Sequence, residues 1–228
     1  MQPIQMVDLQ SQYRQLKKEL DARVIGCIES GAYIQGPEVK SFEADLGKYL
    51  DDAHVIACAN GTDALQIALM ALELDPGDEV IVPSFTFVAS VEVIALLGLK
   101  PIVVDVDPRS FLLKIEDIEA SLSPRTKANI PVHLFGQCVN MKALMAIAKN
   151  RDLFVIEDNA QSIGARCIAT GDAKEMSGSI GHIGCTSFYP SKNLGCYGDG
   201  GAMISRDEHL AHKIKMLANH GMEKRYYH

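Results

Sequence analysis

Short apolar runs that alternate with helix-spaced segments constrain the fold of this chain more than any other feature. The runs are rich in Val and Ile, as expected for strands buried on both faces of a parallel sheet. Between them, apolar residues recur every three or four positions, which predicts helices. The alternation predicts an α/β protein with βαβ units around a mostly parallel sheet flanked by helices. The predicted strands span 54–59, 80–84, 101–107, 129–135 and 153–159.

The last third of the chain follows a different pattern. Two further apolar runs, 185–190 and 201–206, enclose a glycine-rich stretch, and we expect them to pair like a hairpin. The segment between 159 and 185 has no regular pattern, so it is predicted to be a loop. The predicted helices span 9–30, 39–50, 59–74, 88–97, 114–122, 141–149 and 207–220.

Composition excludes some classes of partner. The chain has 228 residues, of which 22 are Lys or Arg and 29 are Asp or Glu, giving a net charge of −7. This acidic balance argues against a nucleic-acid surface, which needs basic patches. The most apolar stretch, 91–107, contains charged residues and is too interrupted to cross a membrane. The first residues lack the basic and apolar regions of a signal peptide. We therefore expect a cytoplasmic protein with no membrane partner.

The cysteines are scattered. No two of the six form a CxxC pair, which argues against a zinc site, and no metal is expected. The spacing predicts free thiols in a reducing compartment. The six are Cys27, Cys58, Cys138, Cys167, Cys185 and Cys196.

The segment ANGTDAL, 59–65, joins a predicted strand to a predicted helix. Gly61 permits a close backbone approach, and Thr62 and Asp63 can cap the helix. Free N–H groups and the helix dipole at such a turn can bind an anion. An ordinary capped turn accounts for the same residues, so both interpretations stay open here.

Two other short segments have side chains suited to ligand binding. Asp158 ends a predicted strand, and ligands of open α/β sheets bind at that edge. A carboxylate there can meet a cationic group, although a turn or capping role is equally consistent with it. Phe85 and Phe87 follow another strand; one of them can line a cleft, but core packing is the simpler interpretation.

Lys192 lies in an unusual setting for a lysine. It sits in SFYPSKNLGCYGDGG, 187–201, among small, aromatic and turn-forming residues, five positions after Ser187. A lysine held among apolar neighbours loses solvation, which lowers its pKa. A neutral amine can form a Schiff base with a carbonyl. The alternative is a surface lysine in a loop.

These features fit one cofactor when they are taken together. Pyridoxal phosphate (PLP) needs donors for its phosphate, a stacking face for its ring, a carboxylate for its pyridine nitrogen and a lysine for its aldehyde. The set of four is far more specific than any member of it. The sequence therefore predicts a PLP site.

The chain also resembles a known family, the DegT/DnrJ/EryC1/StrS sugar aminotransferases. The resemblance covers nearly the whole chain and is strongest in SIGHIGCTSFYPSKNLGCYGDGGA, 179–202. It is also carried by AYIQGPEVKSFE, PGDEVIVPSFTF, FVASVEVIALLG, VHLFGQ and IEDNAQ. The resemblance implies the aspartate-aminotransferase-like fold type I architecture.

The resemblance also implies roles for single residues. Lys192 would hold PLP as a Schiff base and carry protons, and Asp158 would pair with the pyridine nitrogen, so these two are the expected catalytic residues. Gln161 would hydrogen-bond the ring hydroxyl, and Phe87, in preference to Phe85, would stack on the ring. The phosphate would be held by the backbone around Gly61 and Thr62 and by the hydroxyl of Ser187.

The implied reaction moves an amino group from glutamate to a nucleotide-linked keto-sugar. The block around Lys192 most resembles the branch that acts on UDP-linked 3-oxo sugars for surface polysaccharides, and the family implies a homodimer. Members are longer and continue into a small C-terminal domain, so we expect residues 1–228 to be the large PLP-binding domain, with the small domain missing. Two alternatives stay open: a non-catalytic PLP-binding domain, and another PLP reaction such as sugar dehydration. In the dehydrating relatives histidine replaces the lysine, so the presence of Lys192 favours amination.

Overall fold

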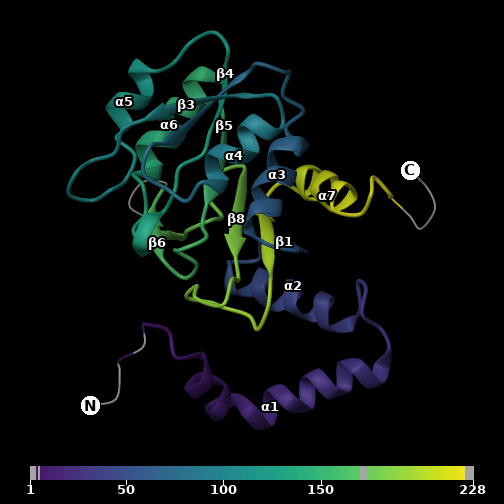
Figure 1. The fold of residues 1–228 in the computed structure, drawn as a ribbon. Coiled ribbons are helices and arrows are strands. Elements are labelled where there is room, and N and C mark those ends of the chain that lie inside the picture. The colour runs from purple at the N-terminus through teal and green to yellow at the C-terminus, as the bar shows by residue number, and fades with distance from the viewer. Residues whose placement is uncertain (1–3, 5, 170–173, 224–228) are drawn as a thin grey trace.

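A seven-stranded sheet forms the centre of the molecule (Figure 1). The structure is a computed structural model that describes residues 4, 6–169 and 174–223, so the predicted domain end at 228 lies outside the described residues. The strands are β1 His54–Cys58, β2 Glu79–Pro83, β3 Lys100–Val104, β4 Thr126–Asn129, β5 Phe154–Asp158, β6 Arg166–Ile168, β7 Lys174–Met176, β8 Ile183–Ser187 and β9 Gly201–Ser205.

The order of strands across the sheet is β1-β9-β8-β5-β4-β2-β3. Neighbours from β3 to β8 are parallel, whereas β9 is antiparallel to both β8 and β1. The mostly parallel sheet is therefore confirmed. The predicted pairing of the two runs that enclose the glycine-rich stretch is also confirmed, since β8 and β9 are joined antiparallel from Gly184↔Ile204 to Ser187↔Gly201.

Helices cover both faces of this sheet (Figure 1). On one face, α3, α4 and α7 pack through Leu65, Val93 and Ile214; on the other, α5 and α6 pack through Ile118 and Leu144. The helices are α1 Leu9–Ser30, α2 Pro37–Tyr49, α3 Gly61–Ala71, α4 Ala89–Leu96, α5 Ile115–Ala120, α6 Met141–Arg151 and α7 Glu208–Leu217.

Strand β2 shows why the central strands are continuously apolar. Val80 and Val82 belong to the core beneath α3 and α4, whereas Ile81 belongs to the core beneath α5 and α6. All three side chains are fully buried. Successive strand residues point to opposite faces, so a sheet covered on both faces needs apolar residues at every position.

The predicted strand at 129–135 is wrong in its position. The strand β4 ends at Asn129, and Leu134–Gly136 form a short 3-10 helix. Pro131 has no N–H to continue the ladder, although its carbonyl accepts a hydrogen bond from the Asp158 N–H (2.9 Å). Phe135 then adopts a left-handed conformation with φ of 56°. The chain stays bonded to its neighbours as far as His133, whose N–H donates to the Asp158 carbonyl at 3.0 Å, and turns out of the sheet only after it.

The segment after β5, predicted to be a loop, contains a small antiparallel pair. Strands β6 and β7 pair from Arg166↔Met176 to Ile168↔Lys174. Each has three residues, too few to show a period-two pattern in the sequence. Met176 packs with Leu46 of α2 and with Leu50, the residue that follows this helix, which explains why such short strands are held in place.

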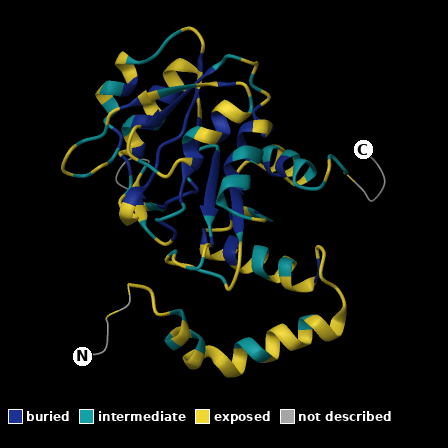
Figure 2. Cartoon of the chain, in the orientation of Figure 1, coloured by how far each residue is buried: buried dark blue, intermediate teal, exposed yellow. Residues whose placement is uncertain are grey.

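Helix α1 has no buried residue and lies apart from the sheet (Figure 2). Its apolar side chains Leu16, Val24, Ile25 and Ile28 are all exposed. Amphipathic helices normally bury such a stripe against another surface. Among the described residues, no helix combines the length and apolar character needed to cross a membrane.

The expectation of six free thiols is wrong for two of them. Cys138, just before α6, and Cys167, on β6, form a disulfide with a Cα–Cα distance of 5.6 Å. They are 29 residues apart in the sequence, so nothing in their spacing indicates a pair. The fold brings them together because α6 and β6 pack on the same core. Cys27, Cys58, Cys185 and Cys196 are free thiols.

We expect this disulfide to contribute measurably to stability. The double variant Cys138→Ser/Cys167→Ser should lower the free energy of unfolding by about 3 kcal/mol. The reason is that the bridge closes a loop between residues 29 positions apart and so reduces the conformational entropy of the unfolded chain. Urea unfolding with and without a reductant measures it. The wild type should lose the same amount on reduction, whereas Cys27→Ser should unfold like the wild type in both conditions. Equal stability of all three proteins would refute the contribution.

Candidate active site

One cleft gathers every residue of the predicted PLP site. It has a volume of about 690 Å³ and lies where β5 and β8 end and where the chain leaves β2. This is the carboxyl edge of the parallel strands, the usual ligand-binding edge of such sheets. The predicted site residues that line it are Gly61, Thr62, Phe87, Asp158, Gln161, Ser187 and Lys192.

The turn between β1 and α3 forms one wall. Asn60 caps the helix, since its side-chain oxygen accepts from the Asp63 N–H at 2.8 Å; Thr62 and Asp63 lie in the first turn and are not the cap. A Cβ on Gly61 would come within 2.7 Å of the Ser187 Cβ, a contact that real structures do not tolerate. Glycine at this position therefore brings the start of α3 against the end of β8 and places the Ser187 hydroxyl beside the helix N-terminus.

The carboxylate of Asp158 lies deep in the cleft and is 6% exposed. Ser90 donates to Oδ2 at 2.8 Å, and the Ala160 N–H donates to Oδ1 at 3.1 Å. Burial raises the pKa of Asp158, while these two donors and the charge of Lys192 act against the increase. A buried carboxylate with few partners is well suited to receive a cationic group.

The side chain of Gln161 has a defined orientation. Its Oε1 accepts from the Phe135 N–H at 2.9 Å, so the two N–H donors of its amide remain for a ligand. Phe135 presents this N–H from its left-handed conformation above the strand end. The structure thus orients Gln161 as a donor into the cleft.

Lys192 reaches the cleft from the loop between β8 and β9. Its backbone N–H donates to the Tyr189 carbonyl at 2.8 Å, which closes a tight turn. Its side chain is half-buried, and within the described residues its ammonium has no hydrogen-bond or ion-pair partner. The turn therefore fixes the backbone of Lys192, and its amine is available to a ligand in the cleft.

The two phenylalanines are not core residues, so that interpretation is wrong. Phe87 is 66% exposed and lines the cleft. Phe85 is also exposed and contacts the tilted ring of Phe111 outside the cleft, with 5.3 Å between the ring centroids. Of the two, only Phe87 is placed to contact a ligand in this cleft.

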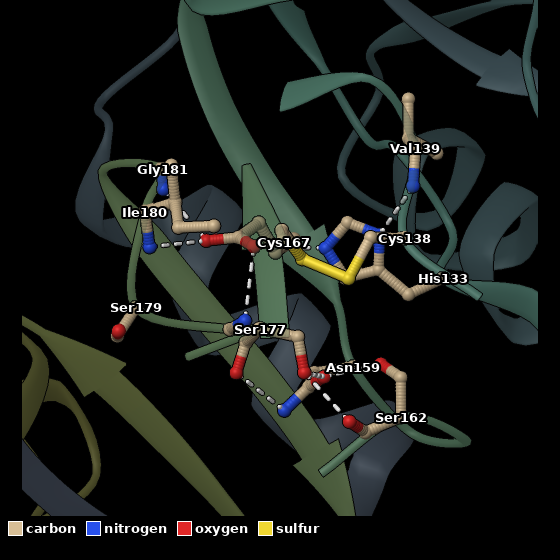
Figure 3. Close-up of polar contacts among 12 residues, drawn as sticks. His133, Cys138, Val139, Asn159, Ser162, Cys167, Ser177, Ser179, Ile180 and Gly181 are labelled. Atoms are coloured by element: carbon tan, nitrogen blue, oxygen red, sulfur yellow. Dashed lines mark hydrogen bonds and ion pairs between the residues drawn. A yellow bond between two sulfur atoms is a disulfide. The ribbon is translucent and has the colours of Figure 1, made fainter. Parts of the chain in front are cut away.

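A buried polar network supports the strand that carries Asp158 (Figure 3). Glu157 points to the opposite face and accepts N–H bonds from Gly178, Ile180 and Gly181 at 2.6–2.9 Å. Its Oε2 lies 2.8 Å from His133 Nε2. Since the Val139 N–H donates to His133 Nδ1, the imidazole carries its proton on Nε2 and donates it to Glu157.

Several cleft residues were not found from the sequence. They include Asn60, Thr86, Asp199 and, behind Asp158, the buried Ser90. Asn60 directly precedes Gly61, so its capping role was readable as the usual residue before a helix start. Thr86 and Ser90 are four positions apart, but their joint direction toward Asp158 depends on how α4 packs on the sheet.

Known proteins are similar to this chain over nearly its whole length. The model of the DegT/DnrJ/EryC1/StrS aminotransferase family matches residues 14–228. A UDP-2-acetamido-2-deoxy-3-oxo-D-glucuronate aminotransferase from Pseudomonas aeruginosa is 48% identical over 99% of the chain and 61% of its own length.

Solved structures share the fold. A DegT DnrJ EryC1 StrS aminotransferase from Brucella abortus is 47% identical, with a TM-score of 0.93 over 98% of this chain and 61% of its own. NtdA from Bacillus subtilis, solved with bound cofactor PMP, is 34% identical, with a TM-score of 0.85 over 93% of this chain and 47% of its own. The chain spans about three fifths of the first two relatives. It belongs to the DegT/DnrJ/EryC1/StrS aminotransferase family.

Proposed function

We propose that this protein is a PLP-dependent aminotransferase that moves an amino group from glutamate to a nucleotide-linked keto-sugar. One observation carries the proposal: a lysine with an available amine and a buried carboxylate share one cleft with a glycine-built turn at a helix start. Each group matches a different part of the cofactor, and a surface lysine or an ordinary capped turn requires no such convergence.

The residues present fit PLP. The Gly61 turn leaves a cradle beside Thr62 and Ser187 that a side chain would fill, and its N–H groups and hydroxyls suit a phosphate. Asp158 would pair with the protonated pyridine nitrogen, and the amide of Gln161 would donate to the ring hydroxyl. Phe87 would cover the ring.

Lys192 would perform two tasks. Its Nζ would bind the cofactor covalently, and after the amino substrate displaces it, the same Nζ would move a proton away from and back to carbon. The cofactor, when bound, supplies the electron sink and carries the amino group between the two substrates. Asp158 would keep the pyridine nitrogen protonated, which that electron sink requires.

The proposed acceptor is a UDP-linked 3-oxo sugar in surface polysaccharide or amino-sugar biosynthesis. The name of the Pseudomonas aeruginosa relative supports this choice, since its substrate is a UDP-linked 3-oxo sugar. Glutamate is the donor that the family resemblance implies. The open cleft, at about 690 Å³, has room for a cofactor and part of a substrate.

We further propose that residues 1–228 form the large, PLP-binding domain of a cytoplasmic homodimer. The complete set of cofactor groups between Gly61 and Lys192 supports the domain assignment. The exposed apolar stripe on α1 supports a subunit contact, since such a stripe is normally covered. The four free thiols are compatible with a reducing compartment.

Absorption spectroscopy tests the proposed function. The full chain is mixed with PLP, the visible band of the lysine adduct is recorded, and glutamate is added, followed by a panel of nucleotide-linked keto-sugars. We expect glutamate to remove the band and a keto-sugar to restore it. A band that no amino acid alters would favour a binding-only domain, and loss of water from the keto-sugar to give a deoxy sugar would favour dehydration.

The cradle at Gly61 can be tested separately. Gly61→Ala should weaken PLP binding at least about tenfold, because the added Cβ forces the turn away from Ser187 and spreads the phosphate donors. Fluorescence titration with PLP gives the dissociation constant. Gly26→Ala is the matched control, since its Cβ would meet no atom within 4 Å. An unchanged dissociation constant for Gly61→Ala would contradict the phosphate assignment.

A further inference from the structure

We infer that the hydroxyl of Ser90, itself oriented by Thr86, is the positioning group that holds the Asp158 carboxylate for a cationic ring nitrogen. The inference rests on the function proposed above. It concerns a second layer of the site that does not touch the cofactor directly.

Geometry defines the direction of the first hydrogen bond. Ser90 lies in the first turn of α4, is completely buried, and places its Oγ 2.8 Å from Asp158 Oδ2. An ionised carboxylate has no proton to give, so Ser90 is the donor. The Ala160 N–H holds the other oxygen. Each oxygen of Asp158 therefore has one donor, and the plane of the carboxylate is fixed.

Thr86 fixes the direction of the Ser90 proton. The two hydroxyl oxygens are 3.1 Å apart. Since a hydroxyl has a single proton and Ser90 uses it on Asp158, Thr86 must donate to Ser90. Thr86 thus donates to Ser90 and Ser90 donates to Asp158, so both hydroxyl protons point toward the carboxylate. Thr86 lines the cleft, so these two hydrogen bonds link the cleft wall to the Asp158 carboxylate.

The charges around Asp158 make this donor important. Burial is the largest influence and raises the pKa of Asp158, and Ser90 is the strongest opposing one, ahead of Ala160, Lys192 and His133. Cys185 on β8 pairs with Asp158 across the sheet, and burial raises the pKa of that thiol, so it brings no charge. Glu157 faces away and is already satisfied.

Loss of the Ser90 hydroxyl should therefore favour the protonated form of Asp158. A protonated Asp158 cannot form an ion pair with a pyridinium nitrogen. Hydrogen bonds to charged groups are about twice as strong as neutral ones, so removing one of two donors should raise the pKa of Asp158 by about one unit. Thr86→Val should have a smaller effect in the same direction.

The test measures the titration of the Asp158 carboxyl group in the protein without cofactor. Carbon-13 NMR of aspartate-labelled protein gives the carboxyl titration, and the Asp158→Asn spectrum assigns the signal. We expect Ser90→Ala to shift the titration midpoint upward by about one unit and Ser90→Thr to restore it. Ser41→Ala is the matched control, because Ser41 also faces a carboxylate, Asp45, but in solvent at 3.5 Å. It should leave Asp158 unchanged.

Each result has one meaning. An unchanged Asp158 titration in both Ser90→Ala and Thr86→Val overturns the inference, even where the wild type binds PLP. Two substitutions are used so that poor folding of one leaves the other decisive. The Ser90→Ala variant should bind PLP at least about fivefold more weakly than the wild type at neutral pH, and its affinity for PLP should recover at higher pH. Failure of the wild type to bind PLP overturns the proposed function without altering the titration result.

Discussion

Replacing Lys192 by alanine is expected to abolish covalent attachment of PLP and to reduce transamination by at least about 10³-fold. The variant loses both the amine that binds the cofactor and the group that moves the proton. Lys192→Arg should be equally inactive, because it keeps the positive charge but offers no amine that can form a Schiff base. Borohydride reduction followed by peptide mass spectrometry locates the attachment, and coupled glutamate turnover measures the rate.

A control separates this role from a general effect of charge. Lys149→Ala removes an exposed lysine from the last turn of α6, before the strand that carries Asp158. It should bind PLP and react with glutamate like the wild type. A labelled peptide that does not contain Lys192, or a Lys192→Ala protein with normal turnover, would show that the lysine of this cleft is not the attachment point.

The second large effect concerns stability. Glu157→Gln should lower the free energy of unfolding by about 3 kcal/mol, because it breaks a fully buried charged network. The carboxylate accepts four hydrogen bonds, from three backbone N–H groups and from His133. In either orientation the new amide NH₂ would face two donors. Urea unfolding measures the loss, and Glu19→Gln, which alters an exposed residue of α1, is the matched control.

The pH dependence of this effect has a defined sign. Burial by itself would raise the pKa of Glu157, but His133 and the backbone donors outweigh it, so the pKa lies below the usual 4.5. A depressed pKa in the folded state stabilises the protein above the unfolded value and ceases to do so as the pH falls through the folded value. The difference between wild type and Glu157→Gln should therefore narrow below pH 4.5. A difference independent of pH would contradict an ionised Glu157.

The residues proposed to hold the cofactor could be predicted from the sequence because each depends on short-range information. Gly61 begins a helix, Asp158 ends a strand and Lys192 lies in a loop between two strands, and such boundaries are specified by the few residues around them. The parallel sheet was also predictable, since strands buried on both faces must be apolar at every position. The errors in the strand at 129–135 and in the loop after β5 arose where a proline or a very short strand interrupts the pattern.

Other features depend on segments that are distant in sequence. The partner of Cys138 is set by the packing of α6 against β6, and no spacing rule identifies it. Ser90 reads as an ordinary helix residue until α4 is placed over Asp158, which is 68 positions away. The same holds for Glu157, whose charge is satisfied by a loop that begins after β7. Long-range contacts of single polar groups produce no periodic pattern in the amino-acid sequence.

The sequence by itself therefore predicted the fold class, the edge of the sheet that carries the cleft, and the lysine, the carboxylate and the glycine turn that line it. Only the tertiary structure decided which hydroxyl holds Asp158 and how Gln161 is turned. The physical reason is that secondary structure follows from local periodicity and turn chemistry, whereas the orientation of a buried polar group follows from donors and acceptors that different elements bring to it.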